Sequence, residues 1–238
     1  MENLLRKNVL VIGAAGGIGK ELVGLLKSSS ANVFLTSTNL AKVQAVANQF
    51  GLAESQCFEM DVTSPNSIQA VADHIHGQVG QLDILINAAG IGILKPLEQL
   101  EHAEFNKTIS INLTGSFNVL KAFLPPMKAV KKGLILHLPG VLGKAPMAGA
   151  TAYAASKYGL NGMVKSLREE LRRTNVRITN IYLGGVDTPF WDDIDMRVQR
   201  DKFITAKEAA RSIWFLCQQP SSGVVAEMVI QPFNHQVI

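Results

Sequence analysis

Cysteines, long apolar runs and low-complexity tracts are scarce or absent in this sequence. The two cysteines, Cys57 and Cys217, belong to no CxxC motif or Cys/His cluster, which argues against a disulfide scaffold or a zinc site. No run approaches the roughly 18 apolar residues that a membrane span requires. Glycine and proline are not enriched, so disorder is excluded. We predict that both cysteines are buried free thiols and that no membrane contact occurs.

The composition is that of one compact soluble domain. The 238 residues carry 23 Lys and Arg against 19 Asp and Glu, a net charge of +4, and 47% are hydrophobic. Such a chain buries a sizeable core without special devices. The densest basic stretch, residues 165–177, is interleaved with two glutamates and lacks aromatics, which favours a solvated helix face over a nucleic-acid patch. The N-terminus does not resemble a signal peptide, so we expect a cytoplasmic protein.

Short β-branched runs alternate with longer segments of helical period along the whole chain, which predicts βαβ units. The expected strands are Asn8–Ile12, Asn32–Thr36, Gln56–Met60, Leu82–Asn87, Gly133–Leu138, Val176–Tyr182 and Val224–Ile230, and the expected helices cover about residues 17–28, 40–50, 65–77, 100–130, 151–174 and 206–218. We predict an α/β fold: a Rossmann-type doubly wound sheet of seven mostly parallel strands with helices on both faces. Residues 1–238 form a single domain in this prediction, and a loop over about 189–205 covers a site at the carboxyl ends of the strands.

The first expected strand runs directly into a glycine-rich turn, Gly13-Ala14-Ala15-Gly16-Gly17-Ile18-Gly19, and helical period follows. A turn of this kind presents backbone N–H groups at a helix N-terminus, where a pyrophosphate is favoured and glycine permits close approach. A tight strand-to-helix turn also needs glycine for conformation alone. Position and spacing favour dinucleotide binding.

The spacing Gly-x3-Gly-x-Gly resembles the short-chain dehydrogenase/reductase family, whose turn is TGxxxGxG, and further matches follow in order along nearly the whole chain. Asn87-Ala88-Ala89-Gly90 is similar to NNAG, Asn112 and Gly115 to NxxG, and Tyr153 with Lys157 to YxxxK. The resemblance implies an oxidoreductase that uses NADP(H) or NAD(H). It implies the cofactor-binding residues Gly13, Gly17, Ile18, Gly19, Ser37, Thr38, Asp61, Val62, Asn87, Ala89, Gly90, Tyr153, Lys157, Gly185, Val186 and Thr188.

Tyr153 and Lys157 stand four residues apart on an expected helix, so their side chains share a face. A nearby ammonium lowers the pKa of a phenol. The resemblance implies that Tyr153 exchanges a proton with the substrate oxygen while hydride moves to or from the cofactor, that Lys157 holds the nicotinamide ribose, and that Asn112 positions a relay water. The alternative for an isolated Tyr-x3-Lys is a surface pair, which the accompanying motifs disfavour.

The main departure lies at Gly140, where the family has a serine that binds the substrate oxygen. Losing one such donor costs about 10² to 10³ in rate. A water, a substrate hydroxyl or His137 are possible substitutes, although a core position on its strand is the simpler role for His137. Ile12, Ala88 and Leu183 also replace usual family residues. The alternative function is therefore a dinucleotide-binding sensor or scaffold with little turnover.

Cofactor choice depends on the end of the second strand. An acidic residue there typically binds the ribose 2′-OH of NAD, yet no Asp or Glu occurs between Ala31 and Ala53. Hydroxyls of Ser37 and Thr38, with Lys42, are candidates to receive a 2′-phosphate, although the arginine typical of NADP enzymes is missing. NADP(H) is slightly favoured over NAD(H).

The sequence leaves the substrate open. Gly140, Met147, Phe190 and Trp191 flank the expected site and are candidates for the substrate pocket, and Leu142 fits either the pocket or the core. A small-molecule carbonyl or alcohol is the expected partner. The resemblance also implies a homotetramer or homodimer formed through the helices near 100–130 and 151–174. Metals are not expected, because the acidic residues of the late loop lack a calcium-loop pattern and His74 and His76 point to different helix faces.

Overall fold

A computed structural model describes residues 1–238. Its seven-stranded sheet has the order β3-β2-β1-β4-β5-β6-β9, and every neighbouring pair is parallel. The strands are β1 (Asn8–Ile12), β2 (Asn32–Ser37), β3 (Cys57–Glu59), β4 (Ile84–Asn87), β5 (Gly133–His137), β6 (Val176–Leu183) and β9 (Glu227–Ile230). The order reverses between β1 and β4, the point at which ligands bind in such sheets. The predicted doubly wound sheet is confirmed.

Helices cover both faces of this sheet. They are α1 (Gly17–Ser28), α2 (Leu40–Phe50), α3 (Pro65–Val79), α4 (His102–Ile109), α5 (Gly115–Ala129), α6 (Thr151–Leu171) and α7 (Ala206–Leu216). Alternate residues of β1 enter two separate cores. Val9 and Val11 pack with α1, α2 and α7, whereas Leu10 and Ile12 pack with α3, α5 and α6. Central strands buried on both sides explain the continuous apolar runs in the sequence.

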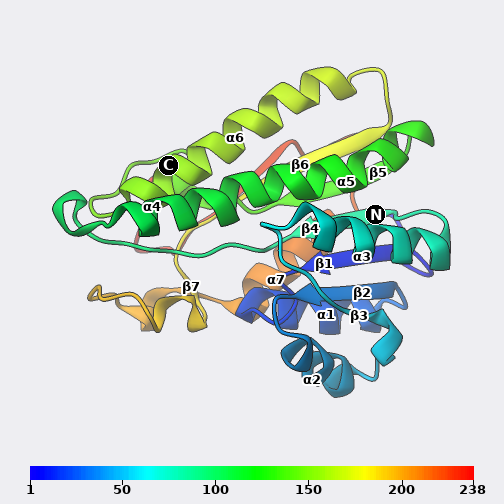
Figure 1. Ribbon diagram of the computed structural model, residues 1–238, viewed down its shortest axis with the longest axis horizontal. Coiled ribbons are helices and arrows are strands. Elements are labelled where there is room, and N and C mark those ends of the chain that lie inside the picture. The colour runs from blue at the N-terminus through cyan, green and yellow to red at the C-terminus, as the bar shows by residue number, and fades with distance from the viewer.

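The expected helix over 100–130 is interrupted. Residues Ser110–Thr114 form a π-helical turn between α4 and α5, and Figure 1 shows the two helices as one long rod. Single π-turns insert an extra residue into a helix and often occur at functional sites. The helical pattern in the sequence predicted one continuous helix and did not indicate this turn.

A second, two-stranded sheet was not predicted. It pairs β7 (Val186–Asp187) with β8 (Ile204–Thr205) in parallel. The segment between these strands protrudes at the lower left of Figure 1. The two short strands thus fix both ends of the loop expected over residues 189–205.

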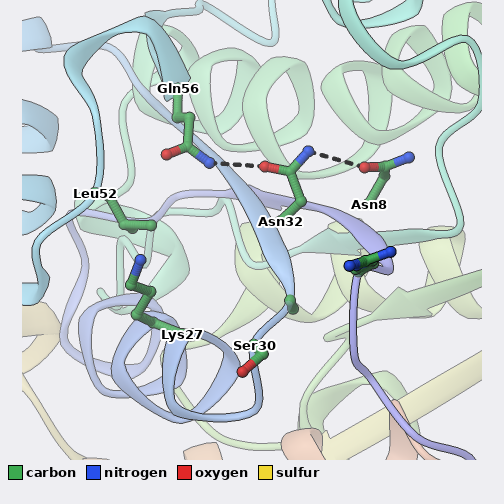
Figure 2. Close-up of a pocket in the computed structure, with 8 residues that line it drawn as sticks. Asn8, Lys27, Ser30, Asn32, Leu52 and Gln56 are labelled. Atoms are coloured by element: carbon green, nitrogen blue, oxygen red, sulfur yellow. Dashed lines mark hydrogen bonds between the residues drawn. The ribbon is translucent and has the colours of Figure 1, made fainter.

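The amino ends of β1, β2 and β3 are joined by amides. Gln56 donates to the side chain of Asn32 at 2.9 Å, and Asn32 donates to that of Asn8 at 2.9 Å. Figure 2 shows these three hydrogen-bonded amides beside a shallow cavity that Lys27 and Ser30 also line. The cavity lies at the amino ends of these strands, whereas the glycine turn follows the carboxyl end of β1.

Both cysteines are buried and free, as predicted. Burial raises the pKa of the Cys217 thiol to about 12, so this sulfur is an inert core atom at neutral pH. No helix in the structure has the length and apolar character needed to cross a bilayer. No group of three or more His, Cys, Asp or Glu side chains is arranged to hold a metal ion.

Candidate active site

Two glycines of the turn between β1 and α1, Gly13 and Gly19, have no room for a side chain. Gly13 has φ +80°, and a Cβ there would lie 3.0 Å from the Ala88 carbonyl carbon. A Cβ on Gly19 would lie 2.4 Å from the Gly13 oxygen. Helix α1 begins without a side-chain cap, so its first N–H groups remain available to an anion. This cradle fits the pyrophosphate of a dinucleotide.

We expect Gly19→Ala to lower the free energy of unfolding by about 2 kcal/mol, since the added methyl forces the turn apart, and to weaken NADP(H) binding at least about tenfold. Thermal denaturation and fluorescence titration measure the two effects. Gly77→Ala is the control, because a Cβ there meets nothing within 4 Å and alanine favours a helix interior. Unchanged dinucleotide affinity in Gly19→Ala would contradict the assignment of this turn.

A cavity of about 900 Å³ opens beside the glycine turn. It brings together most of the predicted site, including residues from five separate segments of the chain. Those lining it are Gly13, Gly17, Ile18, Gly19, Ala89, Gly90, Gly140, Met147, Tyr153, Lys157, Gly185, Val186, Thr188, Phe190 and Trp191. Leu142 lines it as well and is also 8% exposed in a small apolar cluster. Both roles considered for Leu142 are therefore filled.

Six predicted residues lie outside the cavity lining: Ser37, Thr38, Asp61, Val62, Asn87 and Asn112. Ser37 forms hydrogen bonds with the backbone of Asn39 just after β2. The Asp61 carboxylate accepts from Thr63, and Val62 packs where a Cβ on Gly115 would be. These side chains shape the turns that follow β2 and β3.

The buried amides of Asn87 and Asn112 organise the backbone behind the cavity. Asn87 donates to the Ser116 hydroxyl at 3.1 Å and accepts from Ala89 N–H at 3.2 Å. Asn112, in the π-turn, accepts from Ile91 N–H and donates to Ile91 C=O, both at 2.9 Å. The turn thus positions Asn112 against the loop that follows β4.

Tyr153 and Lys157 occupy successive turns at the start of α6 and both line the cavity. The Lys157 ammonium donates to the Leu138 carbonyl at 3.1 Å and lies 5.3 Å from the centre of the Tyr153 ring. Burial lowers the pKa of Lys157 to about 8. Burial also raises the pKa of Tyr153, opposite to the lowering expected from the ammonium alone, because loss of solvent disfavours the phenolate. Tyr153 is therefore a neutral phenol that can donate a proton.

Ser156 connects this pair to Asn112. It accepts from Asn112 Nδ2 at 3.0 Å and donates to the Tyr153 carbonyl at 2.7 Å. The backbone of α6 at Tyr153 is thereby tied to the π-turn. No motif indicated this serine, because it occupies one of the unspecified positions between Tyr153 and Lys157.

Gly140 lies directly beside the Tyr153 hydroxyl. A Cβ there would be 4.0 Å from Tyr153 Oη and 3.5 Å from the Leu183 oxygen. Its backbone has φ +69° and ψ 169°, a conformation essentially restricted to glycine. The backbone at Gly140 thus disfavours any side chain at this position.

His137 is a core histidine, as the simpler interpretation held. It is fully buried and does not line the cavity, and neither ring nitrogen has a hydrogen-bond partner. Burial, and then the charges of Lys157 and Arg168, lower its pKa to about 3. A neutral ring outside the cavity does not replace the missing serine.

An aromatic row forms one wall of the cavity. Ring centres are 5.9 Å apart for Tyr153 and Phe190, 5.3 Å for Phe190 and Trp191, and 5.1 Å for Trp191 and Phe203. Phe190 rests on Gly92, where a Cβ would come within 2.2 Å of its ring. The late loop therefore closes over Tyr153 as an apolar wall.

Sequence reasoning missed several other lining residues. Leu94, Met196, Arg197 and Lys202 belong to loops, and Pro232, Asn234, His235 and Val237 come from the C-terminal segment after β9. No motif marks these positions. The placement of the C-terminal residues depends on where β9 ends. The Gly184 amide donates to the carbonyl of Ile230, the last residue of β9, at 2.8 Å.

The known proteins that this chain resembles are oxidoreductases. The profile of the family described as short chain dehydrogenase matches residues 7–199. An uncharacterized oxidoreductase of Staphylococcus saprophyticus is 30% identical over the full length of both chains. The 3-oxoacyl-[acyl-carrier-protein] reductase of Escherichia coli is 30% identical, over 94% of this chain and 95% of its own.

Solved structures give the same result. A metagenomic short-chain oxidoreductase in complex with NADP has 30% identity and a TM-score of 0.82, covering 97% of this chain and 99% of its own. An alcohol dehydrogenase of Thermococcus sibiricus superposes with a TM-score of 0.86 at 23% identity, covering 97% and 98%, and supports the fold alone. With a profile match over most of its length and full-length relatives, this chain belongs to the short-chain dehydrogenase family of oxidoreductases.

Proposed function

We propose that this protein reduces a carbonyl, or oxidises a secondary alcohol, with Tyr153 as general acid or base. One observation carries the proposal: the Tyr153 phenol and the Lys157 ammonium line the same cavity as the glycine turn. A phenol whose pKa is raised by burial stays protonated at neutral pH and is suited to donate to a carbonyl oxygen. The apolar wall of Phe190 and Trp191 excludes water from that oxygen.

The cofactor in this proposal is NADP(H) or NAD(H), which supplies or accepts the hydride. The α1 N-terminus binds its pyrophosphate, Lys157 binds the nicotinamide ribose, and residues 185–188 line its nicotinamide end. NADP(H) is slightly favoured because the end of β2 has no carboxylate to repel a 2′-phosphate. A relative at 30% identity is in complex with NADP, which supports the same preference.

The lowered pKa of Lys157 predicts that stability and activity change in opposite directions as the pH rises. Its pKa falls from the usual 10.5 to about 8 in the folded chain, so the unfolded chain binds more protons between these values. Stability is therefore expected to rise with pH in that window, whereas kcat/KM for reduction falls above about pH 8 as the ammonium is lost. Thermal melts and NADPH consumption across this range measure both trends. In Lys157→Met the rise in stability disappears; an unchanged rise would show that another group is responsible.

A homodimer or homotetramer through α4, α5 and α6 also remains our proposal. Phe105, Phe117 and Tyr158 on these helices are 37%, 49% and 43% exposed, and exposed apolar side chains on adjacent helices favour association. A cytoplasmic location stays a prediction of the sequence.

Gly140 favours a second candidate function, a dinucleotide-binding protein with little turnover. Without the serine, Tyr153 alone donates to the substrate oxygen among the residues matched to the family. Against this candidate, a pure binder has less need of Tyr153, Lys157 and Asn112 together. Substitution of Gly140 separates the two candidates, as argued in the Discussion.

A further inference from the structure

The cavity is lined by cations and by no anion. Lys157, Arg197 and Lys202 line it, and no Asp or Glu does. The whole chain, by contrast, carries 19 acidic residues against 23 basic ones. A cleft with charges of one sign raises the local concentration of ligands of the other sign. This lining therefore favours an anionic ligand.

Arg197 has no partner within the chain. Its neighbour Arg200 is held by Asp187 and Asp192, at 2.6 Å each, and so fastens the loop. Arg197 forms no hydrogen bond or ion pair, although Asp193 and Asp195 lie on the same loop. Arg197 is exposed and lines the cavity, and its guanidinium donors are free for a carboxylate or phosphate.

Lys202 contributes a second cation from the same loop. Its ammonium donates to Gln199 Oε1 at 2.6 Å. Because an ammonium has three donors, two remain for a ligand. Gln199 also lines the cavity, so this bond keeps the ammonium near the mouth.

The neighbour of Arg197 packs on the same side of the cavity as Tyr153. Met196, the preceding residue, packs against the cluster of Leu94, Leu142 and Ala150, which Tyr153 also contacts. The glycine turn is approached instead by Thr188, whose side chain lies 2.8 Å from where a Cβ on Gly17 would be. The backbone at Arg197 is therefore held on the side of the cavity that Tyr153 lines.

We propose that the substrate is an apolar carbonyl or alcohol compound bearing a carboxylate or phosphate, which Arg197 and Lys202 bind while the aromatic wall holds its apolar part. The proposal rests on the proposed oxidoreductase function. It narrows the substrate class from any carbonyl compound to anionic ones.

The test measures binding without turnover, by calorimetry on protein saturated with NADP⁺. One pair of probes is a series of 4-oxo acids of increasing chain length and their methyl esters. The other is acetoacetyl-coenzyme A and the neutral thioester acetoacetyl-N-acetylcysteamine. In at least one pair the anionic member should bind about tenfold tighter. The responding pair identifies the anion as carboxylate or phosphate.

Arg197→Met should weaken this preference, leaving only the contribution of Lys202, and leave the affinities for the neutral probes and for NADP⁺ unchanged. Lys207→Met is the matched control, since Lys207 is exposed, lies on α7 and does not line the cavity. Absence of a preference in both pairs, or equal weakening of both members by Arg197→Met, would overturn the proposal. A weakened NADP⁺ affinity would overturn it too, by assigning Arg197 to the cofactor.

Turnover of the neutral esters with NADPH, measured alongside, tests the oxidoreductase function separately. Charge-dependent binding without turnover of any probe would retain the anion site and reject the reductase. Turnover with equal affinity for the two members of both probe pairs would retain the reductase and reject the anion site.

Discussion

Replacing Tyr153 with phenylalanine should lower the rate of carbonyl reduction by about 10³-fold or more while leaving dinucleotide affinity close to wild type. A positioned general acid contributes about 10² to 10⁴ in rate. We expect a loss in the upper part of this range, because Gly140 has no side chain to donate a second hydrogen bond to the substrate oxygen. NADPH consumption with saturating carbonyl substrate measures the loss, and fluorescence titration measures the affinity.

Tyr158→Phe is the matched control, because Tyr158 is on the same helix and 43% exposed. The Tyr153→Phe ring retains its packing against Phe190, 5.9 Å away in the wild type, so folding should be unaffected. A Tyr153→Phe variant that kept more than about a tenth of the activity would rule out the phenol as the main proton donor.

The fold could be predicted because parallel sheets leave a strong trace in sequence. Strands such as β5 are buried along their whole length and appear as uninterrupted apolar runs between helices. Local signals also agree with the helix starts: at α3 the Ser64 hydroxyl accepts from Ser67 N–H and Pro65 is the first helical residue, both typical of a helix N-terminus. The ends of the seven predicted strands shifted by a few residues, for example to Glu227 in β9, where the predicted strand began at Val224.

The local motifs predicted residues that mostly line one cavity, because each motif depends on residues close in sequence. The glycine turn and the Tyr153–Lys157 pair require no knowledge of distant contacts. What failed depends on tertiary structure: the π-turn at Asn112 exists to reach Ile91, and the β7 and β8 pair joins residues 18 positions apart at Val186 and Ile204. The C-terminal segment at the cavity gave no signal for the same reason.

The direction of the Tyr153 pKa shift illustrates a different limit. Spacing alone placed an ammonium near the phenol and predicted a lower pKa. Burial of the site, which spacing does not encode, has the larger effect and raises it. Burial also weakens the ammonium itself by lowering the pKa of Lys157 to about 8.

Gly140→Ser tests whether this chain is an enzyme that works without the usual serine. Its backbone, at φ +69° and ψ 169°, strains any side chain, so both Gly140→Ser and Gly140→Ala should lose about 2 kcal/mol of stability. There is room for a Cβ, since the nearest atoms are 3.5 and 4.0 Å away. The alanine variant therefore reproduces the strain without the hydroxyl. The ratio of kcat for Gly140→Ser to kcat for Gly140→Ala measures the effect of the hydroxyl alone.

We expect the serine variant to exceed the alanine variant in kcat by at least about tenfold, because its hydroxyl adds a donor beside Tyr153 Oη where one such group contributes 10² to 10³ in optimised sites. Rates of NADPH consumption for wild type and both variants, with thermal melts to correct for folding, provide the measurement. Equal rates in the two variants would place the reacting oxygen away from Gly140. A silent wild type that binds NADPH, with turnover only in Gly140→Ser, would establish the binding protein instead, since the site would then hold cofactor but lack the donor that reduction requires.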